Sequence, residues 1–221
     1  AYHTYDSIGT YNVSLTVKDN EDFETLLIKQ IKVIFYPTAN FTWSPYPYVR
    51  VSEPVTFNAS LSLPGSGNIT AYIWDFGDGN ITSTTDPIII HTYYETGSYT
   101  VTLTVINSDG LSANLTKRVD VYGDPYANFT WHPTIPITQE ETTFNASSSE
   151  ANGGFIISYI WDFGDGSPLL ETTSPIVTHT YTIYGTFNVT LKVKNNAGFT
   201  GEITKQVTVL SKPTPIFTIA P

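Results

Sequence analysis

Histidine is the side chain best suited to acid–base or zinc chemistry, and three of the four histidines share one spacing. His3, His91 and His179 each begin a His-Thr-Tyr triplet, and successive triplets lie 88 residues apart; the fourth is His132. A position that recurs at a fixed interval describes one repeated role, not a cluster that converges on one centre. No Gly-x-Ser-x-Gly, His-Glu-x-x-His or phosphate-binding-loop pattern is present. We therefore predict structural histidines beside strand ends, and a chain that is not an enzyme.

Carboxylates form the second candidate group, in a motif that occurs twice. Trp-Asp-Phe-Gly-Asp-Gly occupies positions 74–79 and 161–166. Alternation directs its aromatic rings inward, glycine suits the positive φ of a tight turn, and aspartate accepts hydrogen bonds from turn amides. The residues assigned to this structural core motif are Trp74, Asp75, Gly77, Asp78 and Gly79, and in the second copy Trp161, Asp162, Gly164, Asp165 and Gly166.

A calcium site is the alternative role for these carboxylates. It would use Asp75 or Asp78, or the loop acids Asp19, Asp22 and Asp109. Calcium takes six to eight oxygen ligands, and no loop is that dense in acidic residues. We expect no catalytic, cofactor-binding or metal-ligating residue, and we keep Ca²⁺ as the alternative.

The composition excludes several classes of protein. Ten Lys and Arg against 20 Asp and Glu give a net charge of −10, which disfavours nucleic acids and anionic membrane surfaces as partners. The absence of cysteine excludes disulfides and thiolate metal sites. No apolar run approaches the ~20 residues of a membrane span. With 40% hydrophobic and 14% aromatic residues, the chain can bury a core.

The interval of 88 residues recurs near both ends of each repeat, and it shortens to 87 at the Trp-Asp-Phe-Gly-Asp-Gly motif. It also relates Gly9, Gly97 and Gly185, and Phe41, Phe129 and Phe217. We predict that 1–35 is the C-terminal part of one repeat, that 36–123 and 124–211 are complete repeats, and that 212–221 is the first strand of a further repeat. We expect a window on a longer tandem array, completed at its ends by more repeats or by another subunit. A natural chain with ragged ends is the alternative.

The repeat should consist of β-strands, because apolar residues recur at every second position. The clearest strand presents Tyr99, Val101, Leu103 and Val105 on one face, and its copies present Tyr11, Val13, Leu15 and Val17, and Phe187, Val189, Leu191 and Val193. In the first complete repeat we predict strands at about 38–43, 53–59, 69–76, 87–93, 98–105 and 111–122. Six or seven short strands with one polar face each predict a two-sheet sandwich. Proline in the short linkers, at Pro37, Pro125 and Pro213, predicts a semi-rigid rod.

These motifs resemble the polycystic kidney disease (PKD) domain family over essentially the whole chain. Besides the motif at 74–79, the family pattern includes Val-Thr-Phe-Asn-Ala-Ser at 55–60, the His-Thr-Tyr triplet and the strand at 97–105. The resemblance implies an all-β, immunoglobulin-like sandwich in tandem copies. It also implies an extracellular setting, as in archaeal surface-layer proteins, polycystin ectodomains, and bacterial collagenases and chitinases. One departure is that Asn58 and Asn145 replace the usual aspartate of the family.

Asn-x-Ser/Thr sequons are in excess. They include nine of the fourteen asparagines, whereas composition alone predicts about three. A glycan is bulky and must face solvent, which fits asparagines on the polar faces of the predicted strands. We predict covalent N-glycans at Asn12, Asn40, Asn58, Asn68, Asn80, Asn114, Asn128, Asn145 and Asn188. The alternative is a threonine-rich sheet that produces sequons by composition.

The sequence favours a non-enzymatic structural protein of the cell surface or extracellular space. It would be a segment of a glycosylated stalk, surface layer or filament. Its partners would be other copies, neighbouring repeats, or cell-surface and extracellular-matrix components. The alternative is a ligand-binding accessory module of a secreted hydrolase, with exposed aromatics that stack on polysaccharide or collagen. The aromatics considered for that role are Tyr46, Tyr48 and Tyr126.

Overall fold

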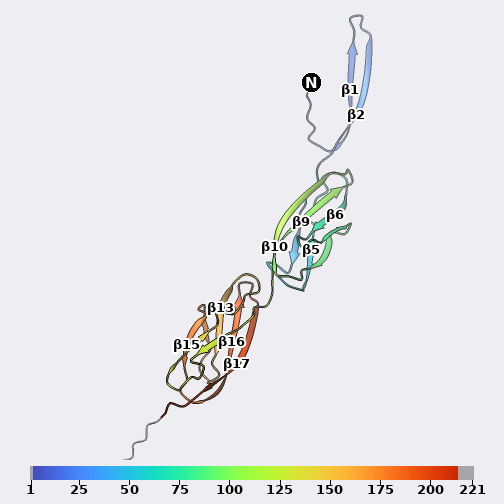
Figure 1. Cartoon of the computed structure of the whole chain (residues 1–221). Coiled ribbons are helices and arrows are strands. Elements are labelled where there is room, and N and C mark those ends of the chain that lie inside the picture. The colour runs from blue at the N-terminus through green and yellow to red at the C-terminus, as the bar shows by residue number, and fades with distance from the viewer. Residues whose placement is uncertain (1, 214–221) are drawn as a thin grey trace, which may run out of the picture. The chain divides into compact units, whose positions relative to one another are not determined.

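A hairpin opens the part of the chain that the structure describes. The computed structural model describes residues 2–213, and these form strands and loops without a helix (Figure 1). Strands β1 (Gly9–Lys18) and β2 (Glu24–Val33) pair antiparallel as a two-stranded sheet. Asp19 closes their turn, because its Oδ1 accepts the amides of Glu21 at 2.9 Å and Phe23 at 3.0 Å.

The first complete repeat contains two sheets. One sheet has the order β3–β5–β8, with β3 Thr42–Ser44, β5 Pro54–Asn58 and β8 Ile88–Thr92. The other has the order β4–β10–β9–β6–β7, with β4 Tyr48–Arg50, β10 Ser112–Tyr122, β9 Gly97–Asn107, β6 Ile69–Asp75 and β7 Ile81–Thr84. The side chains between the sheets form the core, as expected for a sandwich.

The second complete repeat has the same plan. One sheet has the order β11–β12–β15, with β11 Thr130–His132, β12 Glu141–Asn145 and β15 Ile176–Thr180. The other has the order β14–β13–β16–β17, with β14 Leu170–Thr172, β13 Ile156–Asp162, β16 Gly185–Asn195 and β17 Thr200–Val209. The all-β sandwich predicted from the sequence is confirmed.

A tryptophan lies at the centre of each core. Trp74 is fully buried, with its ring edge-to-face to Phe41 at 5.2 Å and 5.6 Å from Phe57. Trp161 is also fully buried, and its corresponding distances to Phe129 and Phe144 are 5.2 and 5.7 Å. The predicted inward direction of both tryptophans is therefore confirmed, and aromatic packing adds to their area burial.

Most predicted strands match the observed ones. The five that correspond to β5, β6, β8, β9 and β10 agree to within two residues at either end. The prediction for 38–43 is wrong in extent, because the amide of Asn40 bonds Ser62 Oγ at 3.0 Å instead of another strand. Strands β4 and β7 were missed, because three or four residues are too few to show a period.

Two compact units divide the described residues. The hairpin and most of the first complete repeat belong to one unit, and the second complete repeat to the other. Of the predicted further strand at 212–221, residues 214–221 lie outside the described part. Among residues 2–213 there is no helix long and apolar enough to cross a membrane.

Candidate functional site

The aspartates of the duplicated motif build turns. Asp75 Oδ1 accepts the Gly77 amide at 2.9 Å, and Asp78 Oδ1 accepts the Asn80 amide at 3.0 Å. Gly77 has a φ of +79°, and a Cβ there would lie 2.7 Å from the Thr100 carbonyl oxygen. Glycine is therefore required both by the left-handed backbone and by the close approach of β9. The second copy repeats both bonds, from Gly164 to Asp162 and from Ser167 to Asp165.

The recurring histidine is held by the same motif. His91 Nε2 lies 2.7 Å from Asp78 Oδ2, and its ring stacks on Phe76 with centroids 4.0 Å apart and planes at 3°. His179 repeats this arrangement with Asp165 at 2.8 Å. Both histidines lie near the end of a strand, as predicted, and each is hydrogen-bonded and stacked. Their purely structural role stays a prediction.

Electrostatics around this histidine favour a charged aspartate. Burial alone would raise the pKa of Asp78, but hydrogen bonds from the Asn80 amide and from His91 outweigh it and lower that pKa. The same balance lowers the pKa of Asp165. Burial raises the pKa of the Tyr93 hydroxyl, with a further contribution from the nearby Asp78 charge. Tyr93 donates to the Phe76 carbonyl at 3.1 Å and remains protonated at ordinary pH.

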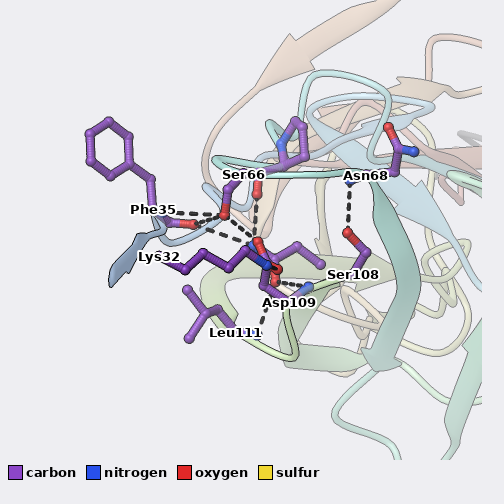
Figure 2. A network of polar contacts seen from close by, with 9 residues as sticks. Lys32, Phe35, Ser66, Asn68, Ser108, Asp109 and Leu111 are labelled. Atoms are coloured by element: carbon purple, nitrogen blue, oxygen red, sulfur yellow. Dashed lines mark hydrogen bonds and ion pairs between the residues drawn. The ribbon is translucent and has the colours of Figure 1, made fainter. Parts of the chain in front are cut away.

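The loop acids considered for calcium have separate partners. Asp19 accepts the turn amides of the hairpin, and Asp22 lies 3.0 Å from Lys18 Nζ. Asp109 forms an ion pair with Lys32 in the network of Figure 2. Residues 2–213 contain no group of three or more His, Cys, Asp or Glu side chains placed to hold a metal. The structure therefore does not bring these carboxylates together.

An aromatic groove beside β3 is the first feature suited to a ligand. It encloses about 560 Å³ and is lined by Thr42, Trp43, Tyr46 and Lys117. The Trp43 and Tyr46 rings meet edge-to-face at 5.3 Å, and Tyr46 is 73% exposed. Lys117 Nζ is held by the Phe41 carbonyl and lies 4.9 Å from the Phe41 ring centroid. The groove thus combines a solvent-exposed aromatic surface with the positive charge of Lys117, which the Phe41 carbonyl holds in place.

A smaller groove occupies the same position in the second repeat. It encloses about 280 Å³ and is lined by Phe129, Thr130, Trp131, Thr134 and Lys205. Lys205 Nζ donates to the Phe129 carbonyl at 2.5 Å and to Asn128 Oδ1 at 2.8 Å. Thr134 replaces the tyrosine of the first groove, and its carbonyl accepts Trp131 Nε1–H at 3.3 Å. The described atoms offer no such acceptor to the buried Trp43 Nε1.

The three tyrosines proposed from the sequence have different surroundings. Tyr46 lines the first groove, whereas Tyr48 is half-buried in β4. Tyr126 is exposed but belongs to the other unit. Tyr46 shares its groove with a second aromatic ring, that of Trp43.

None of the nine sequon asparagines is buried. Five are exposed, namely Asn12, Asn68, Asn80, Asn114 and Asn188, and four are half-buried, namely Asn40, Asn58, Asn128 and Asn145. The Oδ1 atoms of Asn58 and Asn145 accept the amides of Ser60 and Ser147, each at 2.9 Å. That role resembles an aspartate cap and does not use the nitrogen to which a glycan would attach. Their glycosylation stays a prediction.

An asparagine ties each linker to the repeat that follows it. Asn195 is buried, and its Oδ1 accepts the amides of Ala197 at 3.1 Å and Phe199 at 3.0 Å. Its Nδ2 donates to the carbonyls of Gly123 and Ala151, both at 3.2 Å. Asn107 repeats the arrangement in the first complete repeat, where Nδ2 donates to the carbonyls of Phe35 at 3.3 Å and Pro64 at 3.0 Å.

A charged network surrounds the linker that follows the hairpin (Figure 2). Ser66 Oγ donates to Asp109 Oδ2 at 2.7 Å and accepts the Phe35 amide at 3.2 Å. Lys32 of β2 pairs with the same carboxylate. Two hydrogen bonds lower the pKa of the Asp109 carboxyl: the larger effect comes from Lys32 and the smaller from Ser66. At the equivalent position the second repeat has Ala197, so this ion pair is particular to the first linker.

Sequence reasoning missed the groove lysines and the linker asparagines. A signal was present, because Lys29, Lys117 and Lys205 keep the 88-residue interval, as do Asn107 and Asn195. The interval marks equivalent positions but not their contacts. Their roles depend on carbonyls far away in the sequence, which the fold brings close.

Several known proteins are similar to this chain in sequence. The model of the PKD domain family matches residues 36–122 and 123–209. Human polycystin-1 is 26% identical over 210 residues, which cover 84% of this chain and 4% of that protein. A microbial collagenase of Vibrio alginolyticus is 40% identical over 70 residues, which cover 32% of this chain and 8% of the collagenase.

A domain of known structure is also similar in sequence. The PKD1 domain of the Vibrio cholerae metalloprotease PrtV is 30% identical, with a TM-score of 0.33. That alignment covers 39% of this chain and 96% of the domain. The chain spans less than a tenth of the length of polycystin-1 and of the collagenase.

Proposed function

Because the chain belongs to the PKD-domain family, two tandem copies of which form most of its length, we propose an accessory binding role for it. In this proposal the chain is a non-catalytic extracellular segment that holds a larger protein on a fibrous polymer. The observation that carries the proposal is the groove of Trp43, Tyr46 and Lys117. Relatives named as collagenases and as a pre-pro-metalloprotease support a role beside an enzyme.

The chemistry of the groove favours flat apolar rings on the ligand. Tyr46 and Trp43 present aromatic surface on which proline rings of an extended protein chain can stack. The Phe41 carbonyl holds Lys117 in place, so Lys117 can also donate to a backbone carbonyl of the ligand at little cost in side-chain entropy. The net charge of −10 disfavours polyanionic ligands. We therefore propose a proline-rich fibrous protein as the ligand, with polysaccharide as the class to be excluded by experiment.

Depletion assays test this proposal. The chain would be incubated with collagen fibrils and separately with chitin, and the unbound fraction measured. Tyr46→Ala should weaken binding to fibrils at least about tenfold, equivalent to ~1.4 kcal/mol. Tyr94→Ala is the matched control, because Tyr94 is 78% exposed and lies outside the groove. Equal binding of both variants, or binding to chitin alone, would refute the assignment.

A glycosylated stalk, surface layer or filament is a second candidate role. The observation in its favour is that all nine sequon asparagines reach the surface. Attached sugars would shield exposed edges and faces from proteases and from unwanted strand pairing. Its partners would be other copies or neighbouring repeats, and the predicted stiff linkers would serve it. Glycopeptide mapping of protein from its source cells tests it, and unmodified asparagine at all nine sites would rule it out.

A further inference from the structure

The two aromatic grooves differ in one hydrogen bond. In the second repeat, Trp131 Nε1–H donates at 3.3 Å to the carbonyl of Thr134, three residues further along the same loop. In the first repeat, the equivalent nitrogen of Trp43 is shielded from solvent and has no acceptor among the described atoms. A shielded N–H without an acceptor is unfavourable, so a carbonyl that reached it would bind with a gain in free energy.

The sequence explains why the two loops differ. Tyr46 stands at the position of Thr134, and the next residue is Pro47 in the first repeat but Ile135 in the second. A residue that precedes proline is restricted to extended backbone, because the proline ring crowds its amide and its Cβ. This restriction disfavours at Tyr46 the bend that residues 133–135 form around Thr134. The grooves differ in size as well, with about 560 Å³ in the first and about 280 Å³ in the second.

The first groove presents donors that suit a chain of carbonyl acceptors. Trp43 and Lys117 line the same groove, and the Phe41 carbonyl holds the lysine in place. A proline-rich chain in the extended polyproline conformation has no internal hydrogen bonds, and its prolines have no amide hydrogen. Its carbonyls therefore need donors from outside the chain. A groove with an indole N–H beside an ammonium group supplies them, next to aromatic rings on which proline can stack.

We propose that Trp43 determines the specificity of the first groove, because its Nε1–H binds a backbone carbonyl of an extended proline-rich chain. In the second groove the Thr134 carbonyl takes the place of that ligand carbonyl and closes the groove to the same chain. This inference rests on the binding role proposed above and adds the acceptor that the ligand must carry.

The Tyr46 ring moves aside as the ligand enters the groove. The indole nitrogen of Trp43 is shielded, so a carbonyl reaches it only when a neighbouring side chain shifts. Tyr46 is the neighbour suited to that movement, because most of its surface is exposed and its ring meets that of Trp43 edge-on. In its new position the ring stacks on the proline next to the bound carbonyl.

The indole signals of the whole chain test the proposal by nuclear magnetic resonance. Proton–nitrogen correlation spectra resolve the Nε1–H groups, and the variants Trp43→Phe and Trp131→Phe assign the two groove signals. The probe is an acetylated triproline amide. The Trp43 signal should move downfield as its proton enters a hydrogen bond, and the Trp131 signal should stay in place because its acceptor is already present.

Affinity for the same probe is the second measurement. Trp43→Phe keeps an aromatic ring and removes the donor, so binding of triproline should weaken at least about fivefold, equivalent to ~1 kcal/mol. Trp131→Phe is the matched control and should bind triproline as tightly as the unaltered chain. Chitotriose is the corresponding probe for a polysaccharide ligand, and it should leave the Trp43 signal in place.

Four results would overturn the proposal. They are a Trp43 signal that triproline does not move, equal movement of the Trp43 and Trp131 signals, movement with chitotriose alone, and unchanged affinity of Trp43→Phe. These results are distinct from a failure of the proposed function. Fibril binding that depends on Tyr46 while the Trp43 signal stays in place would refute only the donor role. A Trp43 signal that moves with triproline, in a chain that does not bind fibrils, would refute only the fibrous ligand.

Discussion

Asn195 both accepts and donates hydrogen bonds, and the substitution Asn195→Asp removes only its donors. The carboxylate keeps the acceptor for the turn amides of Ala197 and Phe199. It removes both donors, so the carbonyls of Gly123 and Ala151 face a negative charge instead of an amide. An aspartate occurs naturally at the equivalent position of the hairpin, where Asp19 accepts the amides of the turn between β1 and β2.

The size of the effect follows from burial. Two neutral hydrogen bonds contribute about 1 kcal/mol each. Asn195 is 0% exposed, so the new charge is desolvated and meets two carbonyl oxygens. Leaving a buried charge without a partner costs about 3–5 kcal/mol, and the retained turn amides offset part of that. We expect the second repeat to lose about 3–5 kcal/mol of unfolding free energy.

Urea denaturation measures the loss through tryptophan fluorescence, in which Trp131 and Trp161 report the second repeat and Trp43 and Trp74 the first. Amide exchange at Gly123 and Tyr126 reports the linker, since these amides bond the carbonyls of Asn152 and Glu150. Both should exchange faster in the variant, while the first repeat keeps its stability.

Asn196→Asp is the control for this substitution. Its Oδ1 still accepts the Phe155 amide at 3.0 Å, and it loses only a long bond to Tyr122. We expect a change below about 1 kcal/mol. If Asn195→Asp proves no more harmful than this control, the linker hydrogen bonds do not stabilise the repeat and the reasoning fails.

Three further predictions concern the core, the turn and the response to acid. Trp74→Ala should destabilise its own repeat by about 3–5 kcal/mol and leave the repeat of Trp161 folded, as two separate urea transitions would show. Gly164→Ala should cost more than Gly166→Ala by at least about 1 kcal/mol. Both glycines have positive φ, but only at Gly164 would a Cβ meet a carbonyl oxygen, at 2.5 Å; equal midpoints would contradict this. Because the folded pKa of Asp78 is lowered, its stabilisation is complete above the ordinary value of 3.8 and lost as the pH falls through the folded pKa. Asp78→Asn should therefore flatten the dependence of stability on pH below about 4, and an unchanged slope would exclude the His91 pair as its source.

Period and spacing were sufficient to predict the longer strands and the core. The longest strands alternate over enough residues to show which face is buried, and Trp74 lies in such a strand. The turn of Gly77 and Asp78 was also predictable, because positive φ and side-chain caps are local requirements. The short strands β4 and β7 were not, since nothing local distinguishes them from loops.

The groove shows why contacts across the sandwich could not be predicted. Trp43 and Lys117 are distant in the sequence, and they meet because Lys117 binds the carbonyl of Phe41, next to β3. That bond needs both sheets to be in place, so no window of sequence contains it. Once the fold is known, the repeat interval becomes informative, because it shows that the lysine and tryptophan recur and that Tyr46 does not.

At the linkers, residues that keep the repeat interval keep their hydrogen bonds at one position and lose their partners at another. Asn107 and Asn195 keep both the interval and the contacts, so the hydrogen bonds to the preceding linker are part of the repeat itself. Asp109 and Ala197 keep the interval but not the chemistry, because Lys32 and Ser66 give only the first linker an ion pair. Raised salt should therefore weaken the contact between β2 and the first repeat and leave Gly123 unaffected, since salt screens an ion pair whose lysine is exposed and does not screen neutral amide bonds. The exchange rates of the Phe35 and Gly123 amides, measured in 0.05 M and 1 M salt, test this prediction. Equal responses at the two linkers would mean that Lys32 contributes nothing to the first.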